Sequence, residues 1–256
     1  MAISAQQTTT VPLTRMVRRA LPQLRSVDLL SRCAPTSTRR PSTTSLRVDA
    51  PLDWREEDLV ANDIYVRKGA VLLCRGEPFT ALYVVRSGSC KSAITTPEGQ
   101  EQIVAFHIAG EILGVEAIGE GSYGATITAL EDSEFRTMPF DRVQALAQEN
   151  NDFQDTLCAT LSREIRRGRT VAMWLATMRS EQRLASFLLD LADRYGARGY
   201  SSREFVLRMS RQEIGLHLGL SHETVSRWLS TFHRQSLLRV RGRLLTIIDR
   251  GALQAL

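Results

Sequence analysis

Cysteine is scarce in this sequence, whose 256 residues contain four: Cys33, Cys74, Cys90 and Cys158. Their wide separation excludes a disulfide-dense secreted scaffold and a CxxC metal site. No apolar run approaches the ~18 residues that suggest a membrane span. A nucleophile elbow, a P-loop and a catalytic pair of carboxylates are also missing, so we do not expect an enzyme.

The composition that is present is that of a folded protein, with 43% hydrophobic and 24% charged residues. The net charge of +5 conceals an uneven distribution. Residues 1–50 hold 8 Arg and 2 acidic residues, residues 51–178 hold 12 basic and 19 acidic residues, and residues 179–256 hold 13 Arg and 7 acidic residues. A basic end indicates a polyanionic partner, although 31 of the 33 basic residues are Arg, which genomic base composition also favours.

Residues 1–50 are rich in Ser, Thr and Arg and lack sustained hydrophobic periodicity. This composition predicts a disordered basic N-terminal extension. A mitochondrial transit peptide has a similar composition and is the alternative. The long apolar core of a secretory signal is missing.

Short β-branched runs separated by turn residues begin after about Leu52. Ser87-Gly88 and Pro97-Glu98-Gly99 stand where turns are needed. Several short strands at this spacing predict an antiparallel barrel or sandwich and not βαβ units. The predicted strands are Ile64–Arg67, Val71–Cys74, Leu82–Arg86, Cys90–Thr95, Gln102–His107, Ala125–Ala129 and Glu134–Met138.

Helical spacing takes over after Pro139 and continues to about residue 178. One stripe follows the 3-4 spacing of a coiled-coil seam, and we expect it to be a dimer interface. A helix packed on its own domain is the alternative, because the stripe is short and contains a glycine. The stripe consists of Cys158, Leu161, Ile165, Gly168, Ala172 and Leu175.

The last part of the chain predicts an amphipathic helix over Glu181–Tyr195, a strand over Phe205–Met209 and then two short helices. Ser210 with Glu213 forms a capping box that begins the first short helix. Gly219 permits a sharp turn, and Ser221 caps the second helix. Helix, short glycine-containing turn and helix is the helix-turn-helix pattern. The positions expected to be buried are Ile214, Leu218, Val225, Leu229 and Phe232.

The exposed face of the second helix carries Glu223, Ser226 and Arg227 within its first two turns. Glutamate accepts from cytosine, arginine donates two bonds to guanine, and serine adapts to several base edges. An i,i+4 ion pair between Glu223 and Arg227 on a solvated helix is the alternative.

A hairpin over Leu237–Val240 and Leu244–Ile248 follows, and its arginines suit DNA phosphates. The sequence therefore favours a winged DNA-binding module. Its predicted DNA-binding residues are Ser210, Ser221, His222, Glu223, Ser226, Arg227, Arg241 and Arg243. For His222, a surface position without a DNA contact is the alternative.

The stretches Glu223–Arg227 (ETVSR), Ser210–Gly215 (SRQEIG) and Leu218–Leu220 (LGL) resemble the signature of Crp/Fnr transcription regulators. The resemblance extends upstream and runs from about Leu52 to the C-terminus. It is carried there by Leu82–Gly88 (LYVVRSG), Gly99–Ile103 (GQEQI), Phe106–Glu111 (FHIAGE) and Arg183–Leu188 (RLASFL).

This resemblance implies a cytoplasmic homodimer on double-stranded DNA, with the seam helix as the dimerisation helix. Serine at position 226 is typical of the Fnr branch, whose half-site resembles TTGAT. The resemblance therefore implies a palindrome like TTGAT-N4-ATCAA and control of genes for low-oxygen or redox metabolism. It also implies an RNA polymerase contact through the turn at residues 95–100.

The sequence departs from its relatives at both family sensor sites. An iron–sulfur cluster needs four converging thiolates, but only Cys33 lies near the N-terminus and Arg136 occupies the cysteine position of the β-roll. Cyclic-AMP binding needs an Arg-Ser pair for the phosphate, and this chain has Tyr123-Gly124 there.

We therefore expect no cofactor. Glu111, at the position of the family's ribose-binding carboxylate, is expected to be a turn carboxylate. The other cysteines, Cys74, Cys90 and Cys158, are expected to be small buried residues. The histidines show no metal-ligand spacing; they are His107, His217, His222 and His233.

The predicted fold is α+β: an antiparallel β-roll like that of cyclic-nucleotide-binding domains, a long dimerisation helix and a C-terminal winged helix-turn-helix. The expected boundaries are 1–50 for the extension, 51–145 for the β-roll, 146–178 for the dimerisation helix and 179–256 for the DNA-binding domain. Two alternatives stay open for the function: a redox or small-molecule sensor acting through cysteine chemistry, and a cyclic-nucleotide-responsive regulator.

Overall fold

The computed structural model describes residues 62–256, so the predicted N-terminal extension lies outside the described residues. The first part of the described chain, the β-roll, contains eight strands and a 3-10 helix, η4 (Val115–Ala117). All seven predicted strands are confirmed, with ends that shift by one or two residues. The eighth strand, β6, is only two residues long, too short for a recognisable strand pattern in the sequence. The strands are β1 (Asn62–Val66), β2 (Val71–Leu73), β3 (Ala81–Ser87), β4 (Ser89–Thr95), β5 (Glu101–Ile108), β6 (Ile112–Leu113), β7 (Thr126–Ala129) and β8 (Ser133–Pro139).

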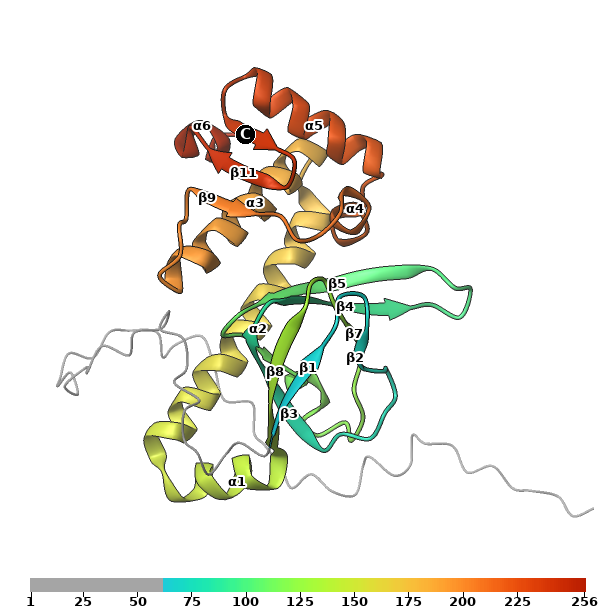
Figure 1. The fold of residues 1–256 in the computed structure, drawn as a ribbon, viewed down its shortest axis with the longest axis vertical. Coiled ribbons are helices and arrows are strands. Elements are labelled where there is room, and N and C mark those ends of the chain that lie inside the picture. Colours follow the sequence, from blue (N-terminus) through green and yellow to red (C-terminus); the bar gives the residue numbers. More distant parts are fainter. Residues whose placement is uncertain (1–61) are drawn as a thin grey trace, which may run out of the picture. The chain divides into compact units, whose positions relative to one another are not determined.

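The eight strands form two antiparallel sheets, ordered β1-β8-β3-β6 and β2-β7-β4-β5 (Figure 1). One core cluster draws Val85 and Phe135 from the first sheet and Cys90 and Ile127 from the second. Residues on the other face of β3, such as Leu82, belong to a second cluster with residues of the helices that follow. Burial on both faces explains why β3 has a nearly continuous apolar sequence.

The predicted turn at Ser87-Gly88 joins β3 to β4 and depends on its glycine. Gly88 has a φ of 88°, and a Cβ atom there would lie 2.2 Å from Ser133 Oγ. Any other residue would be strained and would collide with β8. This turn therefore sets how closely the two sheets approach each other.

Two helices follow the β-roll: α1 (Phe140–Glu149) and α2 (Asn151–Thr177). Asn150 separates them and caps α2, because its side chain accepts a hydrogen bond from Phe153 N. The predicted seam at residues 158–175 lies wholly within the 27 residues of α2.

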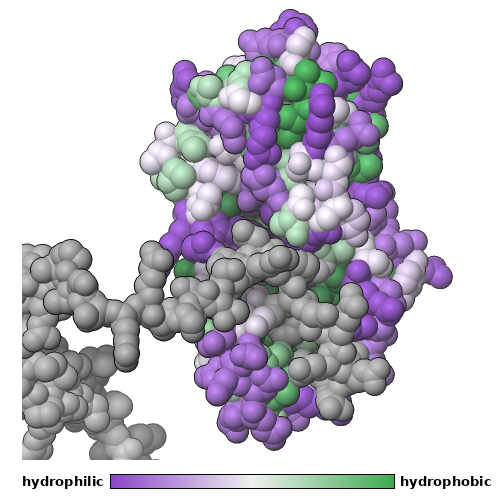
Figure 2. Space-filling view, turned by 90° about the vertical axis from the view of Figure 1, so that its left-hand side faces the viewer, coloured by the Kyte–Doolittle hydropathy of each residue, from purple (hydrophilic) through white to green (hydrophobic). Residues whose placement is uncertain are grey.

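No helix of residues 62–256 combines the length and the apolar character needed to cross a membrane. The face of the molecule in Figure 2 is largely hydrophilic with scattered hydrophobic groups.

The C-terminal part begins with α3 (Ser180–Ala197) and builds a three-stranded sheet, ordered β10-β11-β9. Its strand β9 ends at Val206, so the predicted strand over Phe205–Met209 is wrong for its second half. Leu207 and Met209 are instead buried in the core beside the helices. The short helix α6 was not predicted. The remaining elements are β9 (Glu204–Val206), α4 (Arg211–Leu218), α5 (His222–Arg234), β10 (Leu238–Arg241), β11 (Leu244–Ile247) and α6 (Arg250–Gln254).

Candidate DNA-binding site

The turn between α4 and α5 is held by two glycines. Gly219 adopts a left-handed conformation with a φ of 62°, which ends α4. Gly215 lies inside α4, where a Cβ atom would be 2.4 Å from Leu220 O. The predicted role of Gly219 is confirmed. The sequence did not indicate that position 215 requires glycine, because this requirement comes from contact with Leu220 in the following turn.

Ser210 and Ser221 cap the two helices, as the sequence predicts. Ser210 Oγ accepts from Glu213 N at 3.1 Å, and Ser210 N donates to Glu213 Oε2 at 2.7 Å. Ser221 Oγ accepts from Thr224 N at 3.2 Å. Both hydroxyl groups therefore have structural partners, and a DNA contact by either serine stays a prediction.

Helix α5 buries one side and exposes the other. Val225, Leu229 and Phe232 are almost fully buried, as the sequence predicts. Trp228 adds an anchor that the sequence did not reveal, because its indole N–H donates to Ser180 Oγ on α3 at 3.0 Å. With its buried side fixed in this way, α5 presents a defined outer face.

The outer face of α5 holds Glu223, Ser226 and Arg227, all exposed. The ion pair between Glu223 and Arg227 that was the alternative does not form in the described structure; Glu223 Oε1 instead lies 3.3 Å from His222 Nδ1. Hydrogen bonds from its own backbone N–H and from Ser221 lower the pKa of Glu223. Glu223 is thus an ionised acceptor, and Arg227 remains available as a donor.

The predicted wing is the hairpin of β10 and β11, which turns at Gly242 with a φ of 60°. Arg239, Arg241 and Arg243 are all exposed on it. Arg243 Nη1 also donates to Arg208 O at 3.1 Å, which attaches the wing to the segment before α4. The wing and the outer face of α5 therefore present exposed cations and exposed polar side chains within one domain.

The predicted seam of α2 lies on the surface of the single chain. Ile165 is 56% exposed and Leu175 is 40% exposed. Cys158 and Ala172 are also exposed, and Leu161 is half-buried. Apart from the adjacent backbone of α2, no atom of residues 62–256 would lie within 4 Å of a Cβ atom at position 168. The packing of the described chain therefore leaves this apolar stripe uncovered, and a dimer interface there stays a prediction.

Glu111 accepts a hydrogen bond from Ile108 N at 3.2 Å, as expected of a turn carboxylate, but it is also a buried ion-pair centre, which the sequence did not reveal. Arg194 contacts it twice, with Nη2 2.6 Å from Oε2 and Nε 3.0 Å from Oε1. Arg167 Nη2 lies 3.1 Å and Arg198 Nη2 lies 3.0 Å from Oε1. Burial would raise the pKa of Glu111, but the guanidinium groups of Arg194 and Arg167 hold it well below its usual range. Glu111 thus carries a charge that joins the β-roll to α2 and α3.

Two buried histidines lie near this centre. His107 Nε2 is 2.9 Å from Ser92 Oγ, and burial lowers the pKa of His107 to about 3. His217 Nδ1 is 3.0 Å from Ile103 O, and burial also lowers its pKa. Both are neutral, and no group of three or more metal-ligating side chains occurs within residues 62–256. His222, by contrast, is exposed at the start of α5.

The side chains do not fit the family's usual sensor groups. Tyr123, at the position of the phosphate-binding arginine, is buried, and its hydroxyl donates to Ala81 O at 2.8 Å. Cys90 is buried as predicted, but the same prediction is wrong for Cys74 and Cys158, which are exposed. Cys74 follows β2 in a surface turn, and Cys158 lies on the uncovered face of α2.

Arg136 pairs with Asp63 on β1 and supplies no thiolate. Cys33 lies outside the described residues, so the absence of an iron–sulfur cluster stays an expectation.

Comparisons with known proteins agree with this architecture. A family model described as a Crp-like helix-turn-helix domain matches residues 182–256, and one described as a cyclic nucleotide-binding domain matches residues 63–150. The transcriptional regulatory protein btr of Bordetella pertussis is 42% identical over 200 residues, which cover 78% of this chain and 83% of that protein.

The fumarate and nitrate reduction regulatory protein of Escherichia coli strain K12 is 36% identical over 219 residues, which cover 84% of this chain and 88% of that protein. The solved structure of FixK2 from Bradyrhizobium japonicum is similar with a TM-score of 0.71 and 30% identity, covering 77% of this chain and 98% of that one.

Proposed function

Because the chain belongs to the Crp/Fnr family of transcription regulators, we propose that it binds a palindrome resembling TTGAT-N4-ATCAA as a homodimer. The observation that carries this proposal is the outer face of α5. Glu223, Ser226 and Arg227 are exposed there, and no ion pair in the described structure joins Glu223 to Arg227.

Each group on this face has a distinct task. Arg227 donates two bonds to guanine O6 and N7, Glu223 accepts from cytosine N4, and Ser226 adapts to a neighbouring base edge. Arg241 and Arg243 on the wing contact phosphates, which fixes the position of α5 without reading sequence. His222, Ser210 and Ser221 complete the surface at the starts of the two helices.

The homodimer forms along the uncovered stripe of α2. Burying Ile165 and Leu175 against a second copy removes apolar surface from water. Gly168 supports close contact between the two helices, because no other element among residues 62–256 occupies the space beside it. A two-fold axis along this seam sets the two α5 helices ~34 Å apart, one turn of DNA.

The output of the dimer is transcription activation through RNA polymerase. The exposed turn at residues 95–100 is the proposed contact, and its shape is fixed by a hydrogen bond from Thr96 N to Gln100 O of 2.9 Å. The relatives that regulate fumarate and nitrate reduction favour target genes in low-oxygen or redox metabolism.

A cysteine-based sensor is the second candidate function, because Cys158 is exposed on the proposed seam. Oxidation of a thiol in a dimer interface would change the association of the two chains. A Cys158→Ser variant whose DNA affinity no longer responds to peroxide, while the parent protein responds, would support this candidate.

The test is a titration of labelled palindrome and scrambled DNA at one fixed salt concentration. Arg227→Ala should lose about 1–3 kcal/mol of discrimination at the guanine that it reads. Arg241→Ala should weaken binding to both DNAs alike and reduce the salt dependence by about one charge. Arg169→Ala, which removes the same charge from an exposed position on α2, is the control. Equal affinity of the parent protein for both DNAs would refute the proposal.

A further inference from the structure

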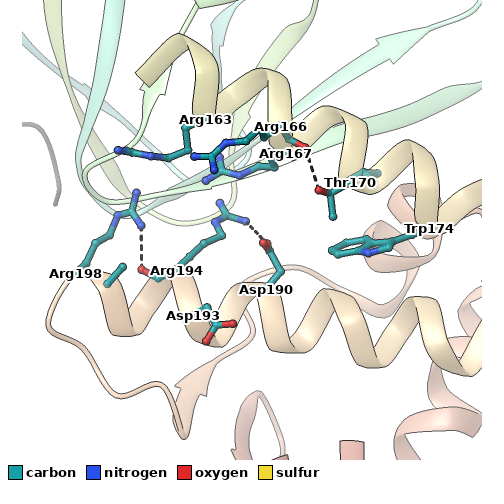
Figure 3. Close-up of a pocket in the computed structure, with 11 residues that line it drawn as sticks. Arg163, Arg166, Arg167, Thr170, Trp174, Asp190, Asp193, Arg194 and Arg198 are labelled. Atoms are coloured by element: carbon teal, nitrogen blue, oxygen red, sulfur yellow. Dashed lines mark hydrogen bonds and ion pairs between the residues drawn. The ribbon is translucent and has the colours of Figure 1, made fainter. Parts of the chain in front are cut away.

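A pocket of about 640 Å³ lies between α2 and α3, away from the outer face of α5. Its size falls within the range of small-molecule sites. Figure 3 shows arginines from both helices directed into one end of it, with Trp174 at the other end. The lining includes Arg166, Arg167, Thr170 and Trp174 of α2 with Arg194 and Arg198.

Positive charge predominates in this pocket. Five arginines line it, and ion pairs connect three of them, Arg167, Arg194 and Arg198, to three carboxylates: Glu111, Glu164 and Asp190. Asp193 also lines the pocket, but it pairs with Arg250. Burial raises the pKa of Glu164.

Two of the arginines keep donors for a ligand. Arg166 is exposed at the pocket and makes no ion pair with the residues that the structure describes. Arg198 Nε is buried and has no hydrogen-bond partner, although Arg198 Nη2 contacts Glu111. Guanidinium groups bind phosphate through paired N–H donors, and an unsatisfied buried donor costs free energy until an acceptor reaches it.

The pocket stays open in the proposed dimer. At 100° per residue, Arg163, Arg167, Thr170 and Trp174 lie on the face of α2 roughly opposite the stripe that contains Ile165. A second copy seated on that stripe would therefore leave the pocket accessible.

We propose that this pocket binds a small molecule that carries a phosphate or pyrophosphate group, with Arg166 and Arg198 as its principal donors. The Arg167 and Arg194 guanidinium groups hold the anion end of the site in place through Glu111. Thr170 and Trp174 bound the opposite end, which takes the rest of the ligand. The site is spatially separate from the proposed DNA contacts, because none of these residues belongs to α5 or the wing.

Isothermal titration calorimetry of the full chain, without DNA, tests the proposal with pyrophosphate, inorganic phosphate, ribose 5-phosphate and ribose. Pyrophosphate or ribose 5-phosphate should bind with a Kd below about 1 mM, and ribose should not bind. A stronger signal for ribose 5-phosphate than for inorganic phosphate would identify an organic phosphate as the ligand, and the reverse order would identify the free anion.

Three variants test the residues. Arg166→Gln should weaken pyrophosphate binding about tenfold, because it removes a charged donor from an exposed position. Asp190→Asn should strengthen binding about fivefold, because it removes a nearby negative charge; a purely structural role for Asp190 does not predict tighter binding. Arg169→Gln on the same helix, outside the pocket, should change nothing. No heat with any phosphate compound at about 10 mM, or an equal loss in Arg166→Gln and Arg169→Gln, would overturn the proposal.

Discussion

Replacing Glu111 by glutamine tests whether the buried carboxylate stabilises the molecule. The change keeps the shape of the side chain and removes one negative charge that is 3% exposed. Arg194 retains Asp190, and Arg167 retains Glu164, but Arg198 loses the carboxylate that its Nη2 contacts. Removing one partner of a buried ion pair costs about 3–5 kcal/mol. Because the other ion pairs remain and the glutamine amide oxygen still accepts hydrogen bonds, we expect the variant to lose about 3 kcal/mol of unfolding free energy, the lower limit of this range.

Urea unfolding, followed by far-UV circular dichroism, measures the loss of stability. The midpoint should fall while the slope m stays unchanged, because the buried surface is the same. Glu134→Gln is the matched control: Glu134 pairs with Arg86 on the surface, where such a pair contributes about 0–1 kcal/mol. An equal shift of the midpoint in the two variants would refute the assigned role of Glu111.

The pH dependence of stability gives a second measurement on the same variant. The folded-state pKa of Glu111 is depressed, so its contribution is fully present above the unfolded pKa of about 4.3 and is lost as pH falls toward the lower folded value. Glu111→Gln should therefore lose less stability than the parent protein below about pH 4.3. Parallel curves for the two proteins in that range would contradict the argument.

The remaining predictions concern His107, the seam and the sensor groups. The folded-state pKa of His107, about 3, lies below its ordinary value of 6.5, so the protein loses stability as pH falls from 6.5 toward 3. His107→Gln should remove on the order of 3 kcal/mol of this loss between pH 6.5 and about pH 4. Urea unfolding at each pH measures the difference. Ile165→Glu should give monomers in sedimentation equilibrium, because it places two carboxylates in an apolar contact. Met173→Glu, at another exposed apolar position of α2, is the control and should leave the dimer intact. Protein purified without oxygen should lack stoichiometric iron and sulfide, should bind its palindrome in air, and should give no heat with cyclic AMP; an iron absorption band that bleaches in air would contradict this.

Local patterns predicted most of the fold because local physics determines those elements. The strands of the β-roll follow β-branched runs between glycine turns, and the caps of α4 and α5 depend on Ser210, Glu213 and Ser221 within one turn of sequence. The end of β9 could not be read in this way. Leu207 and Met209 continue the alternation of a strand, but burial against the helices determines their positions.

The outer face of α5 was also predictable, because a helix with one apolar side exposes the other. The buried ion-pair centre was not, since Glu111 and Arg194 are 83 residues apart. One signal was present: Arg194 follows Leu184, Phe187, Leu188 and Leu191 at helical spacing and therefore lies on the buried side of α3. A charged residue on a buried stripe requires a partner, but the sequence alone does not say which carboxylate supplies it.

The ion-pair centre and the proposed anion pocket share their guanidinium groups, and this sharing determines what a ligand can do. Glu111 belongs to the β-roll, whereas Arg194 lies in α3, the first helix of the DNA-binding part, and Arg198 directly follows that helix. An anion at Arg198 Nε binds the guanidinium group whose Nη2 contacts Glu111. A ligand shifts the equilibrium between two arrangements of α3 and the β-roll only if it binds one of them more tightly than the other. If the ligand changes DNA affinity by some factor, DNA changes ligand affinity by the same factor. An anion bound at Arg198 meets that condition when the two arrangements differ in the Glu111 contacts, because the guanidinium group that it binds also contacts Glu111 of the β-roll.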